Sequence, residues 1–128
     1  MPMTRITLRQ GYSDTRLGEI SDILHQSLID EFAVPEHDRF QIIEILPDAQ
    51  RSFDRHYLSG TRSLDFMLFH IVAGKPRTSA QKQNFYRVLS ERLHTQLDID
   101  PDDVMVVIQF NSAQEWSFSR GEMYRPGG

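Results

Sequence analysis

The sequence predicts an α/β (α+β) fold in which two tandem βαβ units share a four-stranded sheet, with two helices on one face. Two amphipathic helical patterns, each flanked by β-rich apolar segments, predict the units, and a polar connection separates them. With 128 residues, 39% of them hydrophobic, the chain has the size of one ordinary domain. We therefore expect a single domain (1–128) whose repeats cover about residues 2–46 and 64–110, followed by a C-terminal tail, 111–128.

The first unit begins with alternating apolar and polar residues over positions 3–9, which predict a strand. Apolar residues then recur every three or four positions over 13–32 and predict a helix with Ser13 as its N-cap. Because Pro35 disfavours helical backbone at the residue before it, this helix should end near Val34. The β-rich run at 40–46 predicts the second strand.

The second unit repeats this order after a polar connection at 47–62. We expect a strand at 64–73, a helix at 78–97 and a strand at 104–110. At a fixed offset of 65 residues, Ser13 corresponds to Thr78, Leu24 to Leu89, and Asp38 to Asp103. This agreement favours an internal duplication, although any two amphipathic helices agree in part.

The face of the sheet opposite the helices also carries apolar residues. Right-handed crossovers put both helices on one face, yet the strand around 66–72 is apolar on both of its faces. Leu68 and Val72 lie on one face, and Phe69 and Ile71 lie on the other. We expect another subunit to cover the second face, in a closed ring of subunits.

Composition argues against several kinds of partner. The 14 Lys+Arg and 18 Asp+Glu give a formal charge of -4, which provides no basic field for nucleic acid. The apolar runs are too short to span a membrane, and there is no signal-peptide core. The chain has no cysteine, which fits a cytoplasmic location. The sequence shows no metal-ligand spacing and no glycine-rich phosphate loop, so we expect neither a metal nor a nucleotide cofactor.

Pro2 is a candidate catalytic residue because aminopeptidases remove an initiator Met that precedes a small residue. Loss of Met1 would make Pro2 a free secondary amine at the start of a strand. Amino-terminal groups titrate near pH 7.7 to 8.0, so such an amine can act as a general base at neutral pH. The alternative is that Pro2 is an ordinary terminal residue.

The turn Lys75-Pro76-Arg77 lies between a predicted strand and the start of a helix. Two cations and a helix N-terminus favour an anion there, and Arg77 offers a bidentate fork for a carboxylate. The alternative is a solvated turn. Asp38, which precedes the second strand, is able to polarise water or hold a protonated amine, or it is simply a carboxylate that pairs with Arg39.

Late in the chain, Trp116 and Phe118 are able to wall a small pocket or to anchor the tail. Together with Pro2, Asp38 and the basic-Pro-Arg turn, they make the chain resemble the tautomerase superfamily, most closely its malonate semialdehyde decarboxylase group. The resemblance runs from Pro2 to about Tyr124 and includes the strings VPEHDRFQ, KPRTSAQK and EWSFSRG.

The resemblance implies a cofactor-independent enzyme, a homotrimer and an amino-terminal catalytic proline. By position, Pro2 corresponds to the catalytic proline, Asp38 to the active-site aspartate and Arg77 to the main substrate-binding arginine. Lys75 stands where the decarboxylase has another arginine, so the charge is kept but the planar fork is lost. The pocket-lining aromatics of the family correspond to Trp116, Phe118 and Tyr124.

The expected function is that of a lyase or isomerase acting on a small oxo acid. The resemblance favours decarboxylation of malonate semialdehyde, with possible tautomerase or hydratase activity. Pro2 would act as a neutral base, as a protonated group beside Asp38, or as a nucleophile that forms an imine. Two alternatives stay open: a keto-enol tautomerase of a 2-oxo acid of the phenylpyruvate type, and a non-enzymatic, anion-binding oligomeric module.

Overall fold

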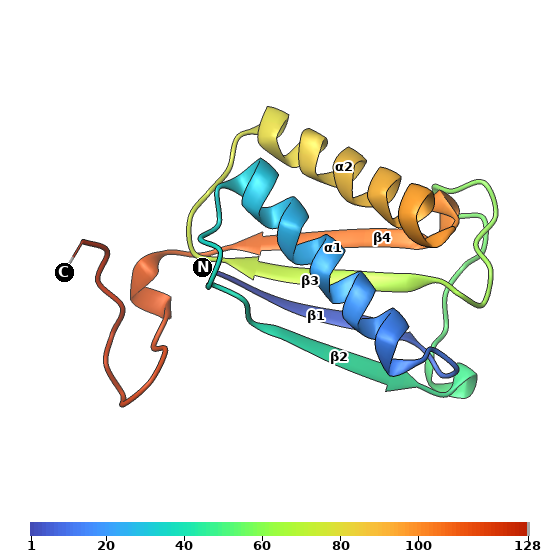
Figure 1. Cartoon of the computed structure of the whole chain (residues 1–128), viewed down its shortest axis with the longest axis horizontal. Coiled ribbons are helices and arrows are strands. Elements are labelled where there is room, and N and C mark those ends of the chain that lie inside the picture. Colours follow the sequence, from blue (N-terminus) through green and yellow to red (C-terminus); the bar gives the residue numbers. More distant parts are fainter. Residues whose placement is uncertain (128) are drawn as a thin grey trace.

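The computed structural model describes residues 1–127 and contains the two predicted βαβ units (Figure 1). In chain order the main elements are β1 (Pro2–Arg9), α1 (Asp14–Phe32), β2 (Gln41–Leu46), β3 (Met67–Ala73), α2 (Ser79–Leu97) and β4 (Val104–Phe110). The strands form a four-stranded sheet in the order β2-β1-β3-β4, and α1 and α2 lie over the same face of it. The predicted fold class is therefore confirmed.

The pairing of the strands brings distant segments to one edge of the sheet. β1 pairs parallel with β2, β3 pairs parallel with β4, and β1 and β3 are antiparallel. The two parallel pairs have the same register at the offset of 65 residues, since Thr4 faces Gln41 and Phe69 faces Val106. Because β1 and β3 run in opposite directions, the start of β1 lies beside the ends of β3 and β4 (Figure 1).

Local sequence signals set the ends of both helices. Ser13 caps α1 by accepting a hydrogen bond from the Arg16 N–H, and Thr78 caps α2 in a reciprocal pair with Gln81. Each helix is followed by a residue in the left-handed conformation, Ala33 or Asp98. The predicted helix positions are confirmed, with Ser13 and Thr78 as caps rather than as first helical residues.

The hydrophobic core fills the layer between the helices and the sheet. Phe32 at the end of α1 stacks on Phe85 of α2, with ring centroids 4.7 Å apart. Burial of each large apolar side chain contributes roughly 1.5 to 3 kcal/mol, so this layer dominates the stability of the fold. Its fully buried members include Ile6, Leu8, Leu24, Leu28, Phe69, Phe85, Leu89 and Leu93.

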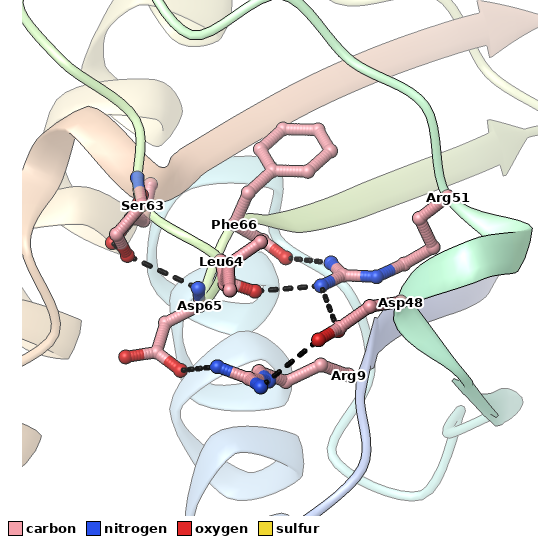
Figure 2. Close-up of polar contacts among 8 residues, drawn as sticks. Arg9, Asp48, Arg51, Ser63, Leu64, Asp65 and Phe66 are labelled. Carbon is pink, nitrogen blue, oxygen red and sulfur yellow. Dashed lines mark hydrogen bonds and ion pairs between the residues drawn. The ribbon is translucent and has the colours of Figure 1, made fainter.

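The third strand begins later than the sequence predicts. The expected strand started at Leu64, but β3 starts at Met67, because the carbonyl groups of Leu64 and Phe66 are bound by the Arg51 guanidinium, each at 2.6 Å (Figure 2). A turn completes this segment, in which the Phe66 N–H donates a hydrogen bond to the Ser63 carbonyl at 3.2 Å. The polar connection therefore takes the backbone acceptors that a strand would have used.

The opposite face of the sheet carries exposed apolar side chains. Ile42, Met105 and Val107 are 46%, 42% and 39% exposed, and all three alternate with residues that face the helices. Polar contacts also lie on this face, such as the 2.6 Å contact between His70 Nε2 and Gln109 Oε1. A surface of this kind is typical of an interface between protein chains.

The tail after β4 contains a short 3₁₀ turn, Ala113–Glu115, and otherwise irregular backbone. Residue 128, the last of the predicted tail 111–128, lies outside the described residues, and the assignment of residues 1–128 to one domain stays a prediction.

Across residues 1–127, neither long helix is apolar enough to cross a membrane. In the same range, no three His, Cys, Asp or Glu side chains gather as metal ligands would.

Candidate functional site

The start of the chain lies at the sheet edge where β3 and β4 end. The Met1 amine forms an ion pair with Asp38 Oδ2 at 2.7 Å, and both side chains are largely shielded from solvent. The Met1 carbonyl accepts a hydrogen bond from the Gly74 N–H at 3.1 Å. Pro2 is buried and pairs with Ala73. The Met1–Pro2 peptide is therefore held from both sides, by the loop after α1 and by the end of β3.

Asp38 reaches this position because the chain turns sharply after α1. The left-handed residue Ala33 ends the helix, and the Val34 N–H bonds back to the Leu28 carbonyl at 3.3 Å. The Asp38 N–H then donates to the Pro35 carbonyl at 3.0 Å. This short turn places Asp38 three residues before β2, next to Met1, the residue before β1.

Gly74 packs closely against the chain start. A Cβ atom at this position would lie 2.5 Å from Met1 Cε and 2.7 Å from Trp116 Nε1, so a larger residue would force a neighbour to move. The Trp116 indole is fixed in turn, because its Nε1 donates to Asn111 Oδ1 at 2.7 Å. The Asn111 N–H donates to the Ala73 carbonyl at 2.9 Å, which extends the pairing of β3 and β4.

The predicted aromatic residues form a wall beside this point. Phe118 stacks on Trp116 with centroids 5.6 Å apart, contacts Phe40 at 5.6 Å, and meets the edge of Tyr124 at 5.4 Å. The Tyr124 N–H donates to the Trp116 carbonyl at 2.8 Å, which folds the tail back on itself. A groove of about 390 Å³ follows the wall and is lined by Met3, Phe40, Val72, Asn111, Glu115, Trp116, Ser117 and Phe118.

The predicted basic residues, Lys75 and Arg77, follow Gly74 in the chain, but within residues 1–127 neither forms a hydrogen bond with the Met1–Pro2 peptide. The Arg77 guanidinium donates to the Phe32 carbonyl at 2.8 Å and to the Lys75 carbonyl, and it lies over the Phe32 ring at 5.1 Å. Burial lowers the pKa of Arg77 from its usual value, but an arginine remains charged at neutral pH. Lys75 is exposed. Within residues 1–127, no hydrogen bond or ion pair joins Arg77 to Pro2 or Asp38.

The structure thus brings Pro2, Asp38 and Trp116 together around Met1, and it gathers Phe118 and Tyr124 beside them. Arg77 and Lys75 lie on the turn after β3, where Arg77 binds the end of α1.

Sequence reasoning missed three residues of the site: Gly74, Asn111 and Phe40. Gly74 and Asn111 directly follow β3 and β4, and the carboxyl end of a strand was the signal used for Lys75. The same signal therefore could have identified both of them. Nothing comparable in the sequence marks Phe40, which meets Phe118 only in the folded chain.

Comparison of the sequence with known proteins gives a consistent result. A sequence model for a family described as "Tautomerase enzyme" matches residues 38–119. The probable tautomerase YusQ of Bacillus subtilis is 35% identical over 121 residues, which cover 94% of this chain and 95% of that protein. The probable tautomerase YrdN of the same organism is 32% identical, over 95% of this chain and 94% of that protein.

Solved structures with the same fold include two malonate semialdehyde decarboxylases. One, described together with its decarboxylase and hydratase activities, is 30% identical with a TM-score of 0.88, over 94% of this chain and 93% of that one. The second, FG41 malonate semialdehyde decarboxylase inhibited by 3-bromopropiolate, is 27% identical with a TM-score of 0.87, over 94% and 92%. A fused 4-OT, described as an asymmetric trimer, shares the fold at 21% identity, a TM-score of 0.76 and 94% coverage of both chains.

Proposed function

Because this chain belongs to the tautomerase family, we propose that it is a cofactor-independent enzyme that uses the amine of Pro2 on a small oxo acid. The proposed reaction is the decarboxylation of malonate semialdehyde or a similar 3-oxo acid, with tautomerase or hydratase activity at the same site. The observation that carries this proposal is the 2.7 Å ion pair between the chain-terminal amine and Asp38, which lies next to the buried Pro2.

The proposal requires removal of Met1. Proline is small enough for an aminopeptidase to accept as the second residue, and cleavage turns the Pro2 nitrogen from an amide into a secondary amine. Asp38, which pairs with the Met1 amine, would then lie near the Pro2 amine. A carboxylate close to an amine favours its protonated form, whereas burial favours the neutral form. The balance between the two decides whether Pro2 acts as an acid or as a base.

Substrate binding would use the basic turn and the aromatic wall. Arg77, with Lys75 beside it, is proposed to hold the substrate carboxylate. Arg77 would then exchange its hydrogen bond to the Phe32 carbonyl for a stronger, charge-assisted hydrogen bond to the carboxylate. Trp116, Phe118 and Tyr124 are proposed to exclude water from the other side. With Pro2 protonated, the 3-oxo group is polarised, so the electrons released by loss of carbon dioxide move toward that oxygen.

The aromatic wall favours a second candidate reaction, keto-enol tautomerisation of a 2-oxo acid of the phenylpyruvate type. The groove beside Phe118 and Phe40 is wide enough, at about 390 Å³, to accept a phenyl ring. In this reaction neutral Pro2 would take a proton from one atom of the enol and return it to another. An anion-binding module without catalysis is the remaining alternative.

We also propose a homotrimer that buries the exposed face of the sheet. Ile42 on one edge strand and Met105 and Val107 on the other give this face exposed apolar side chains, and the fused 4-OT of the same fold is described as a trimer. Analytical ultracentrifugation of the intact protein tests this, since a monomeric mass at micromolar concentration would contradict it.

The test of function is acetaldehyde formation from malonate semialdehyde by protein whose loss of Met1 has been confirmed by mass. We expect turnover that Pro2→Ala and Arg77→Ala each reduce by about 10²-fold or more, while both variants stay folded. Pro126→Ala and Arg87→Ala change an exposed proline and an exposed arginine and serve as matched controls.

Turnover that is equal in Pro2→Ala and in the unmodified protein would contradict the proposal. If neither malonate semialdehyde nor the enol of phenylpyruvate reacts, while a small carboxylate still binds with Arg77 dependence, the site is an anion-binding module.

A further inference from the structure

Met1 occupies the space in which the substrate of the proposed reaction has to bind. The contacts of Met1 therefore indicate which protein groups can bind a substrate there. The Met1 carbonyl carbon is covalently bonded to the Pro2 nitrogen, and its oxygen accepts the Gly74 N–H at 3.1 Å. The Met1 side chain ends against Gly74 and Trp116. The structure therefore holds a carbonyl carbon on the Pro2 nitrogen with its oxygen already hydrogen-bonded.

The bond from Gly74 is the last one that β3 makes to the start of the chain. Pro2 and Met3 pair with Ala73 and Val72, and the contact between Met1 and Gly74 continues this ladder by one residue. Removal of Met1 takes away the acceptor but leaves the donor, because Ala73, the residue before Gly74, is still paired with Pro2. A buried N–H without a partner is costly, so water or a ligand oxygen must take the place of the Met1 carbonyl.

We propose that the Gly74 N–H binds the oxygen of a covalent adduct between the Pro2 nitrogen and the carbonyl carbon of a short oxo acid. This inference rests on the proposed function, but it assigns decarboxylation to a covalent route through neutral Pro2 rather than to polarisation by protonated Pro2. An amide and a carbinolamine share the same C–N bond with an oxygen on the same carbon. The hydrogen bond seen to the Met1 oxygen is therefore available to the oxygen of the adduct, on which negative charge develops.

The proposed step begins when the lone pair of neutral Pro2 attacks the carbonyl carbon and the carbonyl π pair moves to the oxygen beside Gly74. The proton on the nitrogen moves to that oxygen and makes it a hydroxyl group. A second proton, taken from solvent, lets this oxygen leave as water when the nitrogen lone pair forms the C=N bond of an iminium. In a 3-oxo acid, the bond to the carboxylate carbon then breaks. Carbon dioxide leaves, and the electron pair neutralises the iminium as an enamine. Protonation of the carbon and addition of water release the aldehyde and free Pro2.

The same contacts limit the size of the substrate. Trp116 Nε1 is held by Asn111 at 2.7 Å, so the indole closes the space on the side where the Met1 side chain lies. Even one added Cβ at Gly74 would come within 2.7 Å of that nitrogen. The site next to the Pro2 nitrogen therefore fits a chain about as long as a methionine side chain, that is, an oxo acid of roughly three to five carbons.

The first test detects the covalent adduct. Protein without Met1 is mixed with malonate semialdehyde and sodium borohydride, and the N-terminal peptide is analysed by mass spectrometry. We expect alkylation of the Pro2 nitrogen. In protein that retains Met1, this nitrogen is an amide, and we expect it not to be alkylated. Turnover that depends on Pro2 but yields no alkylated Pro2 would overturn the covalent route and leave the proposed function standing. Alkylation without turnover would do the reverse.

The second test isolates the Gly74 N–H by comparing Gly74→Pro with Gly74→Ala. Both variants add a Cβ beside Trp116, but only the proline lacks the N–H. Circular dichroism confirms folding, and we expect the rate of borohydride trapping to be at least about tenfold lower in Gly74→Pro than in Gly74→Ala. Equal rates in the two folded variants would overturn the assignment to Gly74.

A measurement on the unsubstituted protein covers the case in which Gly74→Pro does not fold. The exchange rate of the Gly74 amide proton is measured by NMR in protein without Met1, with and without saturating pyruvate, an oxo acid that cannot lose carbon dioxide by this route. Trp116 is the single tryptophan of the chain, so its fluorescence reports pyruvate binding at the site. We expect pyruvate to slow the exchange about tenfold or more; binding without slower exchange would overturn the proposal.

Discussion

The two ends of the sheet are built alike but used differently. Asp38 and Asp103 are 65 residues apart and occupy equivalent positions, each after a helix that ends in a left-handed residue and each closed by a short turn. Asp38 binds the chain-terminal amine at 2.7 Å, whereas Asp103 accepts the Ser63 N–H and hydroxyl, both at 2.6 Å. The Asp38 carboxylate thus binds the start of the chain, whereas the Asp103 carboxylate binds a residue in the middle of the chain.

An arginine reinforces the likeness, since the last carbonyl of each helix accepts a hydrogen bond from an arginine side chain. Arg77 binds the Phe32 carbonyl at 2.8 Å, and Arg16 binds the Leu97 carbonyl at 3.2 Å. The difference lies in the partner of each carboxylate: the connection that leads into β3 supplies Ser63 to Asp103, whereas the Met1 amine pairs with Asp38. A free terminus can react, whereas the same position within a continuous chain carries only amide nitrogen.

The connection is fixed firmly at the Asp103 end (Figure 2). Arg51, which is only 5% exposed, binds two backbone carbonyls and lies 3.5 Å from Asp48. Arg9 contacts Asp48 at 3.1 Å and Asp65 at 3.6 Å, as Figure 2 shows. A larger hollow, of about 600 Å³, is at this end, but several charged side chains that line it already have partners: Arg9 pairs with Asp65, Arg16 binds the Leu97 carbonyl, and Asp103 binds Ser63. Volume alone therefore does not identify the reactive end.

The largest effect should come from Asp38→Asn, which keeps the shape of the side chain but removes its charge. We expect kcat/KM to fall about 10² to 10⁴-fold, because Asp38, which pairs with the Met1 amine, would lie near the Pro2 amine of the proposed reaction once Met1 is removed. The free energy of unfolding, measured in urea, should change little. A variant that keeps full activity would show that the two carboxylates do not differ in function.

Asp103→Asn is the matched change at the other end and should have the opposite outcome. Asp103 is 3% exposed and accepts two short hydrogen bonds from Ser63. Replacing one carboxylate oxygen by an NH₂ group sets a donor against a donor, which should cost about 1 to 3 kcal/mol of unfolding free energy. The kcat per folded molecule should stay within about twofold of the unsubstituted protein; a larger loss of kcat would break the comparison.

The smallest expected effect is a pH dependence at the Asp103 end. Burial, and then Asp65 and Asp103, raise the pKa of Tyr12 above its usual value. The folded protein thus holds the Tyr12 proton more tightly than the unfolded chain does. The resulting stability is fully present below about pH 10 and is lost as the pH rises through the folded-state pKa. Tyr12→Phe should therefore lose less stability than the unsubstituted protein between neutral and strongly alkaline pH. Equal losses in urea titrations would show that Tyr12 does not contribute.

Much of the fold follows from local sequence, and the exceptions have a common cause. The apolar stripes and the caps Ser13 and Thr78 predict both helices, because they act within a few residues along the chain. The start of β3 was predicted three residues early, because Arg51 reaches the 64–66 segment from elsewhere in the chain. Phe40 could not be identified as a site residue because Phe118, the ring that it meets, is likewise distant in sequence.

The sequence by itself determined the two helices, the order of the strands within each unit and the residues that resemble a family of enzymes. The roles of Pro2, Asp38 and Arg77 remain predictions that the proposed experiments test. Only the tertiary structure decided that Arg77 binds the end of α1 and that the chain start lies between Asp38, Gly74 and Trp116. The physical reason is that hydrogen bonds and close packing act over a few ångströms, and only folding brings residues so far apart in the chain within that range.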